Sequence, residues 1–202
     1  MSVAALILAA GRGSRFGESP KLLALLEGRP LVRHVADAAL ASRARPVLAV
    51  TGHRADAIEA ALAGLPVATL RNPDHADGLS TSLRAGFAAL AGEAAAIVVL
   101  LADMPRVTPD LVDRLIAAWE TGGRPPAVVP VAGGRRGNPV LLSAALAPAV
   151  AGLAGDAGAG PLLRGLPGVL EVDVPGDAAL IDVDTPAMLA RLPSPGWERG
   201  RG

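Results

Sequence analysis

The sequence predicts an α/β protein with a mostly parallel central sheet. Short apolar runs alternate with segments that carry apolar residues at helical spacing, which is the pattern of successive βα units. Because 51% of the 202 residues are hydrophobic, the chain can bury one good core. It contains no cysteine, so neither disulfides nor cysteine-bound zinc is expected to stabilise the fold.

The expected strands are short apolar runs that end at turn residues. In chain order they are Val3–Leu8, Val47–Val50, Val67–Leu70, Ala96–Leu101 and Ala127–Val131, with shorter ones near Val140–Leu142 and Val169–Val172. Runs of this length that are rich in Val, Ile and Leu are typical of strands buried on both faces. Such strands belong to parallel sheets covered by helices.

Helices are expected between these strands. The clearest one follows Thr108–Pro109, which supplies an N-cap and a first-turn proline. Its apolar face consists of Leu111, Val112, Leu115, Ile116 and Trp119. Weaker helical patterns lie at Leu31–Leu40 and Ala55–Leu62, and further ones follow Ser80 and Pro186.

The charge balance excludes partners that are recognised by bulk charge. Lysine and arginine number 19 and aspartate and glutamate number 19, so no nucleic-acid or anionic membrane partner is expected. No apolar run reaches the roughly 20 residues of a membrane span, and the first residues lack the basic region of a signal peptide. We therefore expect a cytoplasmic protein with a single domain, residues 1–192, and a disordered polar tail, residues 193–202.

The loop after the first strand, AAGRGSRFGESPK (Ala9–Lys21), carries the strongest functional signal. It leaves the carboxyl end of a strand, where ligands bind in open parallel sheets. Gly11 and Gly13 let backbone N–H groups approach an anion without an intervening Cβ atom. Arg15 and Lys21, the only lysine of the chain, could then converge on one polyphosphate. The alternative is an ordinary glycine-rich turn with solvated arginines.

Two familiar phosphate-binding loops do not fit this segment. The dinucleotide fingerprint is G-x-G-x-x-G, and counted from Gly11 and Gly13 its third glycine would fall one residue before Gly17. The second strand also ends in TGH, where the fingerprint expects an acidic residue that binds the ribose. The Walker A loop needs Gly-Lys-Ser/Thr in succession, whereas Lys21 follows Pro20. A nicotinamide oxidoreductase is therefore disfavoured.

The segment LAAGRGSRFGESPKLL resembles the N-terminal motif of the MobA-like nucleotidyltransferases, which move an NMP unit from an NTP onto a phosphate or alcohol. The Ala-Ala-Gly triplet, Arg15 and Lys21 occur in the order of that motif. Guanylyl-transferring relatives usually carry two glycines where this chain has Ala10–Gly11, so the chain most resembles the molybdenum cofactor cytidylyltransferases. The resemblance implies a Rossmann-like three-layer sandwich.

A second motif, GLSTSLRAG (Gly78–Gly86), follows the third predicted strand and opens a helix. Its free N–H groups and hydroxyls could contact a base, ribose or phosphate. The alternative is that Ser80 or Ser82 merely caps the helix. Because the segment resembles its cytidylyltransferase equivalent almost residue for residue, we expect a nucleotide contact together with a cap.

Carboxylates that could hold a metal follow two later strands. The apolar strand in IVVLLADMP leads to Asp103, and Mg²⁺ prefers one or two carboxylates with phosphate oxygens and water. A turn-forming aspartate is the alternative. The resemblance implies a second metal ligand at Asp184, with Asp182 in reserve because it points to the same side of an extended strand. Asp184 or Thr185 is also expected to cap the last helix.

Two segments are implied by the resemblance to face the acceptor, namely GGRRGNPVLL (Gly133–Leu142) and GDAGAGPLL (Gly155–Leu163). Arg135 and Arg136 could equally form a solvated turn. Asn138 stands where many relatives have histidine, so the role of its side chain stays open.

These motifs predict a Mg²⁺-dependent nucleotidyltransferase that moves CMP from CTP to the phosphate of a molybdopterin-type acceptor and releases pyrophosphate. The predicted catalytic residues are Arg15, Lys21 and Asp103, and the predicted metal ligands are Asp103 and Asp184. The predicted nucleotide-binding residues are Ala9, Ala10, Gly11, Gly13, Arg15, Lys21, Gly78, Ser80, Ser82 and Asp103. The acceptor's own phosphate is the nucleophile, so the histidines have no assigned role.

Three alternatives stay open beside this prediction. The first is the same fold with GTP or another phosphorylated acceptor. The second is a non-catalytic nucleotide-binding factor that matures a molybdoenzyme, and the third is the disfavoured nicotinamide oxidoreductase. In the main prediction a molybdoenzyme that receives the product is a further expected partner.

Overall fold

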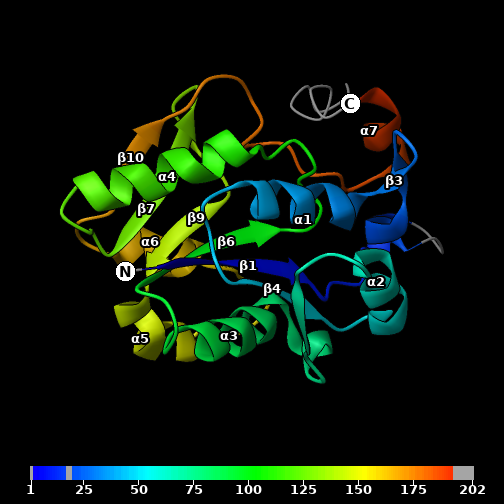
Figure 1. Cartoon of the computed structure of the whole chain (residues 1–202), viewed down its shortest axis with the longest axis horizontal. Coiled ribbons are helices and arrows are strands. Elements are labelled where there is room, and N and C mark those ends of the chain that lie inside the picture. Colours follow the sequence, from blue (N-terminus) through cyan, green and yellow to red (C-terminus); the bar gives the residue numbers. More distant parts are fainter. Residues whose placement is uncertain (1, 17–19, 193–202) are drawn as a thin grey trace.

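A computed structural model describes residues 2–16 and 20–192, and its main feature is an eight-stranded sheet (Figure 1). The strand order is β10, β7, β9, β6, β1, β4 and β5, with β8 paired to β7. The strands are β1 Val3–Ala9, β4 Val47–Thr51, β5 Ala68–Arg71, β6 Ala96–Leu101, β7 Ala127–Ala132, β8 Arg135–Arg136, β9 Val140–Ser143 and β10 Leu170–Asp173. The pairs β6–β1, β1–β4, β4–β5 and β10–β7 are parallel. Strand β9 runs antiparallel to both β6 and β7.

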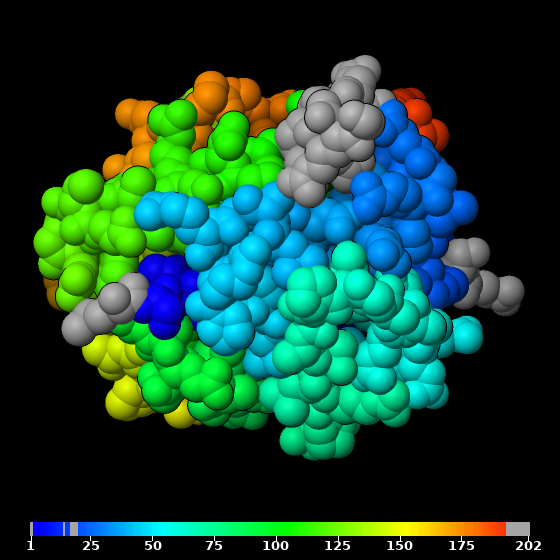
Figure 2. Space-filling model, in the orientation of Figure 1, coloured from blue at the N-terminus to red at the C-terminus, as the bar shows by residue number. Residues whose placement is uncertain are grey.

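Helices cover both faces of this sheet, which confirms the predicted three-layer α/β architecture (Figure 1). One face carries α1 (Leu31–Ala41), α2 (Ala55–Leu62) and α4 (Pro109–Thr121). The other carries α3 (Leu79–Leu90), α5 (Ala147–Ala151) and α6 (Gly160–Gly165). The space-filling view shows α1 and α2 next to each other on the surface that covers the first face (Figure 2).

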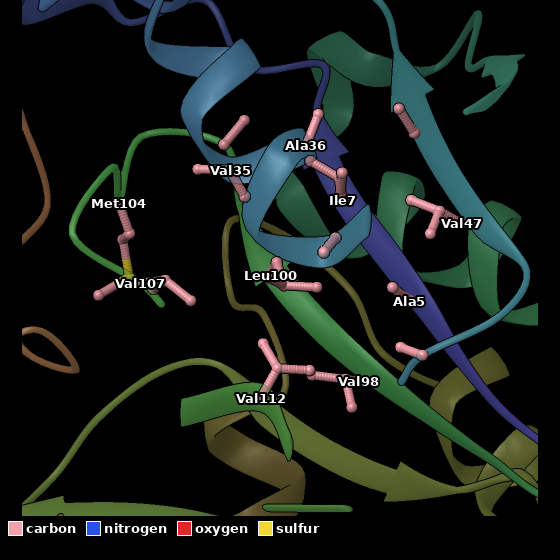
Figure 3. Packing of buried hydrophobic residues seen from close by; sticks show 14 of the residues in the cluster. Ala5, Ile7, Val35, Ala36, Val47, Val98, Leu100, Met104, Val107 and Val112 are labelled. Atoms are coloured by element: carbon pink, nitrogen blue, oxygen red, sulfur yellow. The ribbon is translucent and has the colours of Figure 1, made fainter. Parts of the chain in front are cut away.

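The core lies on the two sides of β1, all of whose residues are buried. Ala5 and Ile7 pack toward α1, and Figure 3 shows them among buried side chains from that helix and from β6. Leu6 and Leu8 point to the opposite face, toward α3. Alternate residues of a strand face opposite sides of a sheet, so β1 is apolar throughout because both of its sides are covered.

Every apolar run predicted as a strand forms one, with ends that differ by one residue at most. The helices predicted at Leu31–Leu40, Ala55–Leu62 and beyond Pro109 are also present. The short elements were not predicted: the hairpin of β2 (Leu25–Leu26) and β3 (Arg29–Pro30), and helices α5 and α6. The two hairpin strands have two residues each, and α5 and α6 have five and six, which is too short for a helical apolar period. Helix α7 (Pro186–Arg191) has six residues too, but its N-cap and first-turn proline predict it in the sequence.

The tail predicted at residues 193–202 lies outside the described residues, and the single-domain organisation of 1–192 stays a prediction. The described part of the chain contains no helix with the length and apolar character of a membrane span. The last described helix, α7 (Pro186–Arg191), lies near the hairpin (Figure 1).

Candidate active site

Lys21 lies at the centre of a cluster of charged side chains at the carboxyl edge of the sheet. Its ammonium nitrogen is 2.7 Å from Asp103 Oδ2 and 2.8 Å from Asp184 Oδ1. Asp103 follows β6, and Asp184 precedes α7, so the cluster joins segments far apart in the chain. The backbone N–H of Val183 donates to the carbonyl of Asp103 at 2.9 Å and fixes the two segments to each other.

The charges of this cluster shift each other's titration. Burial alone would lower the pKa of Lys21, but the charges and hydrogen bonds of Asp103 and Asp184 outweigh it and raise that pKa. The hydrogen bond from Lys21 lowers the pKa of Asp184; burial opposes it, and the charges of Lys21 and Arg15 add to the lowering. The ammonium and the carboxylate are therefore both charged near neutral pH.

Three carboxylates converge at this point. Asp103, Asp182 and Asp184 each offer an oxygen, and these three oxygens lie within 4.8 Å of one another. Asp103 Oδ1 is buried and has no hydrogen-bond partner, which marks a lone pair directed at something other than protein. Hard divalent cations take oxygen ligands of this kind. The cluster therefore fits a metal ion, and it includes both Asp184 and the reserve candidate Asp182.

The first loop supplies the second cation of the site. Arg15, whose side chain is 76% exposed, places Nη1 2.5 Å from Asp184 Oδ2. Arg15 and Lys21 thus both contact the carboxylate of Asp184, and their convergence on a polyphosphate stays a prediction. Gly13 has a φ of +59°, and a Cβ there would lie 2.7 Å from the Cβ of Lys21. The loop can pack against the lysine stem only because residue 13 is glycine.

The segment after β5 is held rigidly beside the loop. The Asn72 amide donates to Thr81 Oγ1 at 2.8 Å and to Ser82 Oγ at 2.9 Å. Gly78 has a φ of +110°, and a Cβ there would lie 2.4 Å from the carbonyl carbon of Gly155. The turn that opens α3 is thereby pressed against residues 155–156.

The predicted capping of α3 is wrong, whereas the cap of the last helix is confirmed. The N-cap of α3 is Gly78 and makes no side-chain cap, because the helix already begins at Leu79. Ser80 is completely buried and its hydroxyl has no partner. At α7 the Thr185 hydroxyl accepts a hydrogen bond from the Met188 N–H at 3.2 Å.

Three adjoining cavities lie along this edge of the sheet. The central one, about 170 Å³, is lined by Leu8, Gly11, Gly13, Lys21, Leu22, Leu79, Leu101 and Asp103. On one side is a polar cavity of about 420 Å³, lined by residues 10–13, 75, 76, 78, 79, 82 and 156. On the other side is a cavity of about 380 Å³. The central cavity shares Leu8, Leu79 and Leu101 with the 380 Å³ cavity, and Gly11, Gly13 and Leu79 with the 420 Å³ cavity. The three therefore adjoin as a row, and Lys21 and Asp103 line its central member.

The 380 Å³ cavity combines an apolar floor with a few polar groups. Its floor consists of side chains from four strands and from α6, namely Leu8, Val99, Leu101, Val129, Val140 and Leu163. Arg136, Asn138 and Arg164 are the polar side chains that line it. Arg136 is partly neutralised, because its Nε lies 2.7 Å from Glu171 Oε1. Both segments predicted to face an acceptor contribute to this cavity.

The predicted site residues divide into those that line the cavities and those that do not. Residues 10, 11, 13, 21, 78, 82 and 103 line one or more of them. Ala9 is buried in β1 and Ser80 in α3, and neither lines any of the three cavities. Arg135 also lines none of them, whereas Arg136 does.

Sequence reasoning gave no role to several residues that line the row, among them Leu79, His75, Asp156 and Arg164. A leucine carries no functional signal by itself, and an exposed arginine such as Arg164 is indistinguishable from an ordinary surface residue. Asp156 does lie within the quoted segment Gly155–Leu163, and this position was the available signal, whereas His75 precedes the motif that begins at Gly78.

The comparisons with known proteins agree with this architecture. The family model described as the MobA-like NTP transferase domain matches residues 5–172. The nicotine blue oxidoreductase of Paenarthrobacter nicotinovorans is 35% identical over 201 residues, which cover 94% of this chain and 96% of that protein.

Two solved structures show the likeness in three dimensions. Rv0371c from Mycobacterium tuberculosis H37Rv has a TM-score of 0.81 and 28% identity, covering 95% of this chain and 96% of that one. Its complex with manganese has a TM-score of 0.78 and 27% identity, covering 95% and 97%. A nucleotidyl transferase from Methanothermobacter, Mth528, has a TM-score of 0.79 and 27% identity, covering 94% and 95%.

Proposed function

This chain belongs to the MobA-like NTP transferase family, and we propose that it transfers CMP from CTP to the phosphate of a molybdopterin-type acceptor. The observation that supports the proposal is the row of cavities, with Lys21 and Asp103 of the charged cluster lining the middle one. A nucleotidyl transfer needs a nucleoside site and an acceptor site on opposite sides of the reacting phosphate. The row provides space for both.

The nucleoside fits the polar 420 Å³ cavity. It lies against the glycine loop and the turn at Gly78, where backbone groups and Ser82 can contact a base and ribose. Ala10–Gly11 stands where guanylyl-transferring relatives usually have two glycines, which favours CTP over GTP. The acceptor's ring system fits the 380 Å³ cavity, because its apolar floor suits the faces of a flat heterocycle and its polar groups suit the edges.

The chemistry requires positioning and charge neutralisation by the chain. An oxygen of the acceptor phosphate attacks the α-phosphorus of CTP, the bond to the bridging oxygen breaks, and pyrophosphate leaves. Lys21, Arg15 and the N–H groups of the loop stabilise the negative charge that develops on the leaving group. Asp103 and Asp184, with Asp182 beside them, would hold Mg²⁺. When bound, Mg²⁺ supplies further neutralisation of the phosphate oxygens.

The test is pyrophosphate release with Mg²⁺ and each of the four NTPs, with and without molybdopterin. Release with CTP alone, and only when the pterin is present, supports the proposal. Release with GTP alone contradicts the base assignment, and CTP binding without any release supports the non-catalytic maturation factor. We expect Asp103→Ala to abolish the Mg²⁺-dependent activity, and unchanged metal dependence would remove Asp103 from the site.

The likeness to nicotine blue oxidoreductase favours a second candidate, a redox reaction on an aromatic compound. The chain has no cysteine and no tyrosine, so a redox step would need a bound electron carrier. The glycine spacing and the missing ribose acid speak against a nicotinamide carrier. Oxidation of NADH or NADPH in the presence of nicotine blue, without release of pyrophosphate from any NTP, would establish this candidate instead.

Two further expectations belong to the proposal. A molybdoenzyme is the expected recipient of the product, and the protein is expected to act in the cytoplasm. Co-purification of the tagged protein with a molybdenum hydroxylase from its own host would support the first, and cell fractionation would test the second.

A further inference from the structure

Lys21 occupies the position that a metal ion would take in the acidic cluster. Its ammonium lies between Asp103 and Asp184, at 2.7 and 2.8 Å, and its side chain is only 9% exposed. The oxygens offered by Asp103, Asp182 and Asp184 lie within 4.8 Å of one another, a space that admits one cation. An ammonium and a divalent ion in that space would be like charges in contact.

The charge count of the cluster leads to the same conclusion. Three carboxylates face Lys21 and Arg15, which leaves one negative charge in excess. A divalent ion added to this arrangement would turn the excess positive. A triphosphate changes the balance, because its oxygens offer both the metal and the displaced ammonium new partners.

The loop geometry gives Lys21 a route out of the cluster. Lys21 also lines the central cavity, into which the phosphates of the proposed reaction would extend. Its stem packs against Gly13, in the same loop that would contact those phosphates. Phosphates in the central cavity would therefore be alternative partners for the ammonium, because the Lys21 side chain borders both that cavity and the carboxylates.

We propose that Lys21 is a stand-in cation that keeps free divalent metal out of the acidic cluster until a nucleoside triphosphate draws the ammonium away. The inference rests on the proposed function, because it takes the cluster to be the metal site of that reaction. It adds an order of events: metal enters with the nucleotide, and in the metal-free enzyme the ammonium of Lys21 stays paired with Asp103 and Asp184.

The experiment measures Mn²⁺ binding by electron paramagnetic resonance in nucleotide-free protein and in protein with a non-hydrolysable CTP analogue. Without nucleotide, Lys21→Met should bind Mn²⁺ at least about tenfold more tightly than the wild type, because no ammonium has to be displaced. The CTP analogue should then increase Mn²⁺ affinity less in the variant than in the wild type. A residue that only contacts phosphate would not alter nucleotide-free metal binding.

Two further variants make the result interpretable. Arg114→Met removes an exposed positive charge of α4 that lines none of the three cavities, and we expect it to change Mn²⁺ affinity by no more than about threefold, since exposed charges are screened. Lys21→Gln keeps a hydrogen-bonding side chain and should behave like Lys21→Met if the latter folds poorly. Equal or weaker nucleotide-free Mn²⁺ binding in both Lys21 variants overturns the inference while the proposed transfer stands. Absence of Mn²⁺ binding in every protein, with and without the analogue, would overturn the metal site of the proposed function as well.

Discussion

Gly13→Ala is expected to disrupt the packing of the first loop against Lys21. The new Cβ would lie 2.7 Å from the Cβ and 3.2 Å from the Cδ of Lys21, closer than carbon atoms approach without displacement. Alanine at a φ of +59° adds about 1–2 kcal/mol of backbone strain, and overpacking adds about 1–3 kcal/mol. Alanine also lowers the conformational entropy of the unfolded chain relative to glycine, which offsets about 0.4–1 kcal/mol of this loss. We therefore expect the free energy of unfolding to fall by about 1–5 kcal/mol, with a central value of about 3 kcal/mol.

The chain offers a matched control two residues earlier. A Cβ at Gly11 would meet nothing within 4 Å, and Gly11 is not in the left-handed region. Gly11→Ala should change stability by less than about 1 kcal/mol. Urea unfolding of both variants without nucleotide measures the difference. If the free energies of unfolding of the two variants agree to within about 0.5 kcal/mol, the packing of Lys21 against Gly13 is refuted.

The remaining predictions concern turnover, titration and packing. Lys21→Ala should reduce transition-state stabilisation by about 2–4 kcal/mol in the pyrophosphate-release assay. Lys21→Arg should also be less active, because a planar guanidinium replaces a compact ammonium. Full activity of Lys21→Arg would show that the choice of lysine is accidental. The hydrogen bond from Arg71 is the largest cause that lowers the pKa of Glu59, so the associated stabilisation is present above the unfolded value of about 4.3 and is lost as pH falls through the folded pKa. Arg71→Ala should raise the pKa of Glu59 in an NMR titration, and an unchanged pKa would contradict the pairing. Gly86→Ala should lower the free energy of unfolding by about 1–2 kcal/mol, since its Cβ would lie 2.3 Å from a methyl of the fully buried Leu6 in β1. Gly92→Ala serves as the control, because a Cβ at that position meets nothing within 4 Å. Equal stabilities of the two variants would refute the contact between residue 86 and Leu6.

Much of the fold could be predicted because its signals are local. An apolar run such as Ala96–Leu101 is a strand in the sequence and in the structure, since its hydrophobicity requires burial on both faces. The helix at Pro109–Thr121 was equally predictable from its cap and its apolar stripe. The order of the strands was not, because nothing in β9 itself states that it runs antiparallel between β6 and β7.

The candidate site shows the same division. The glycine loop, Lys21 and Asp103 stand out in the sequence, because glycines and charged residues at strand ends are typical of phosphate and metal sites. Lys21 and Asp184 are 163 residues apart in the sequence, so no local pattern predicts that they pair. The apolar cavity is likewise assembled from side chains of four strands and α6, each of which reads in the sequence as ordinary core.

The sequence alone determined the family motifs, the two-sided core and the residue types that approach the sheet edge. These depend on neighbouring residues, and their physical causes, burial and backbone freedom, act over a few positions at a time. The tertiary structure alone decided what Lys21 contacts. The fold brings the loop after β1, the end of β6 and the segment before α7 to one point, and there the ammonium of Lys21 lies between the carboxylates of Asp103 and Asp184.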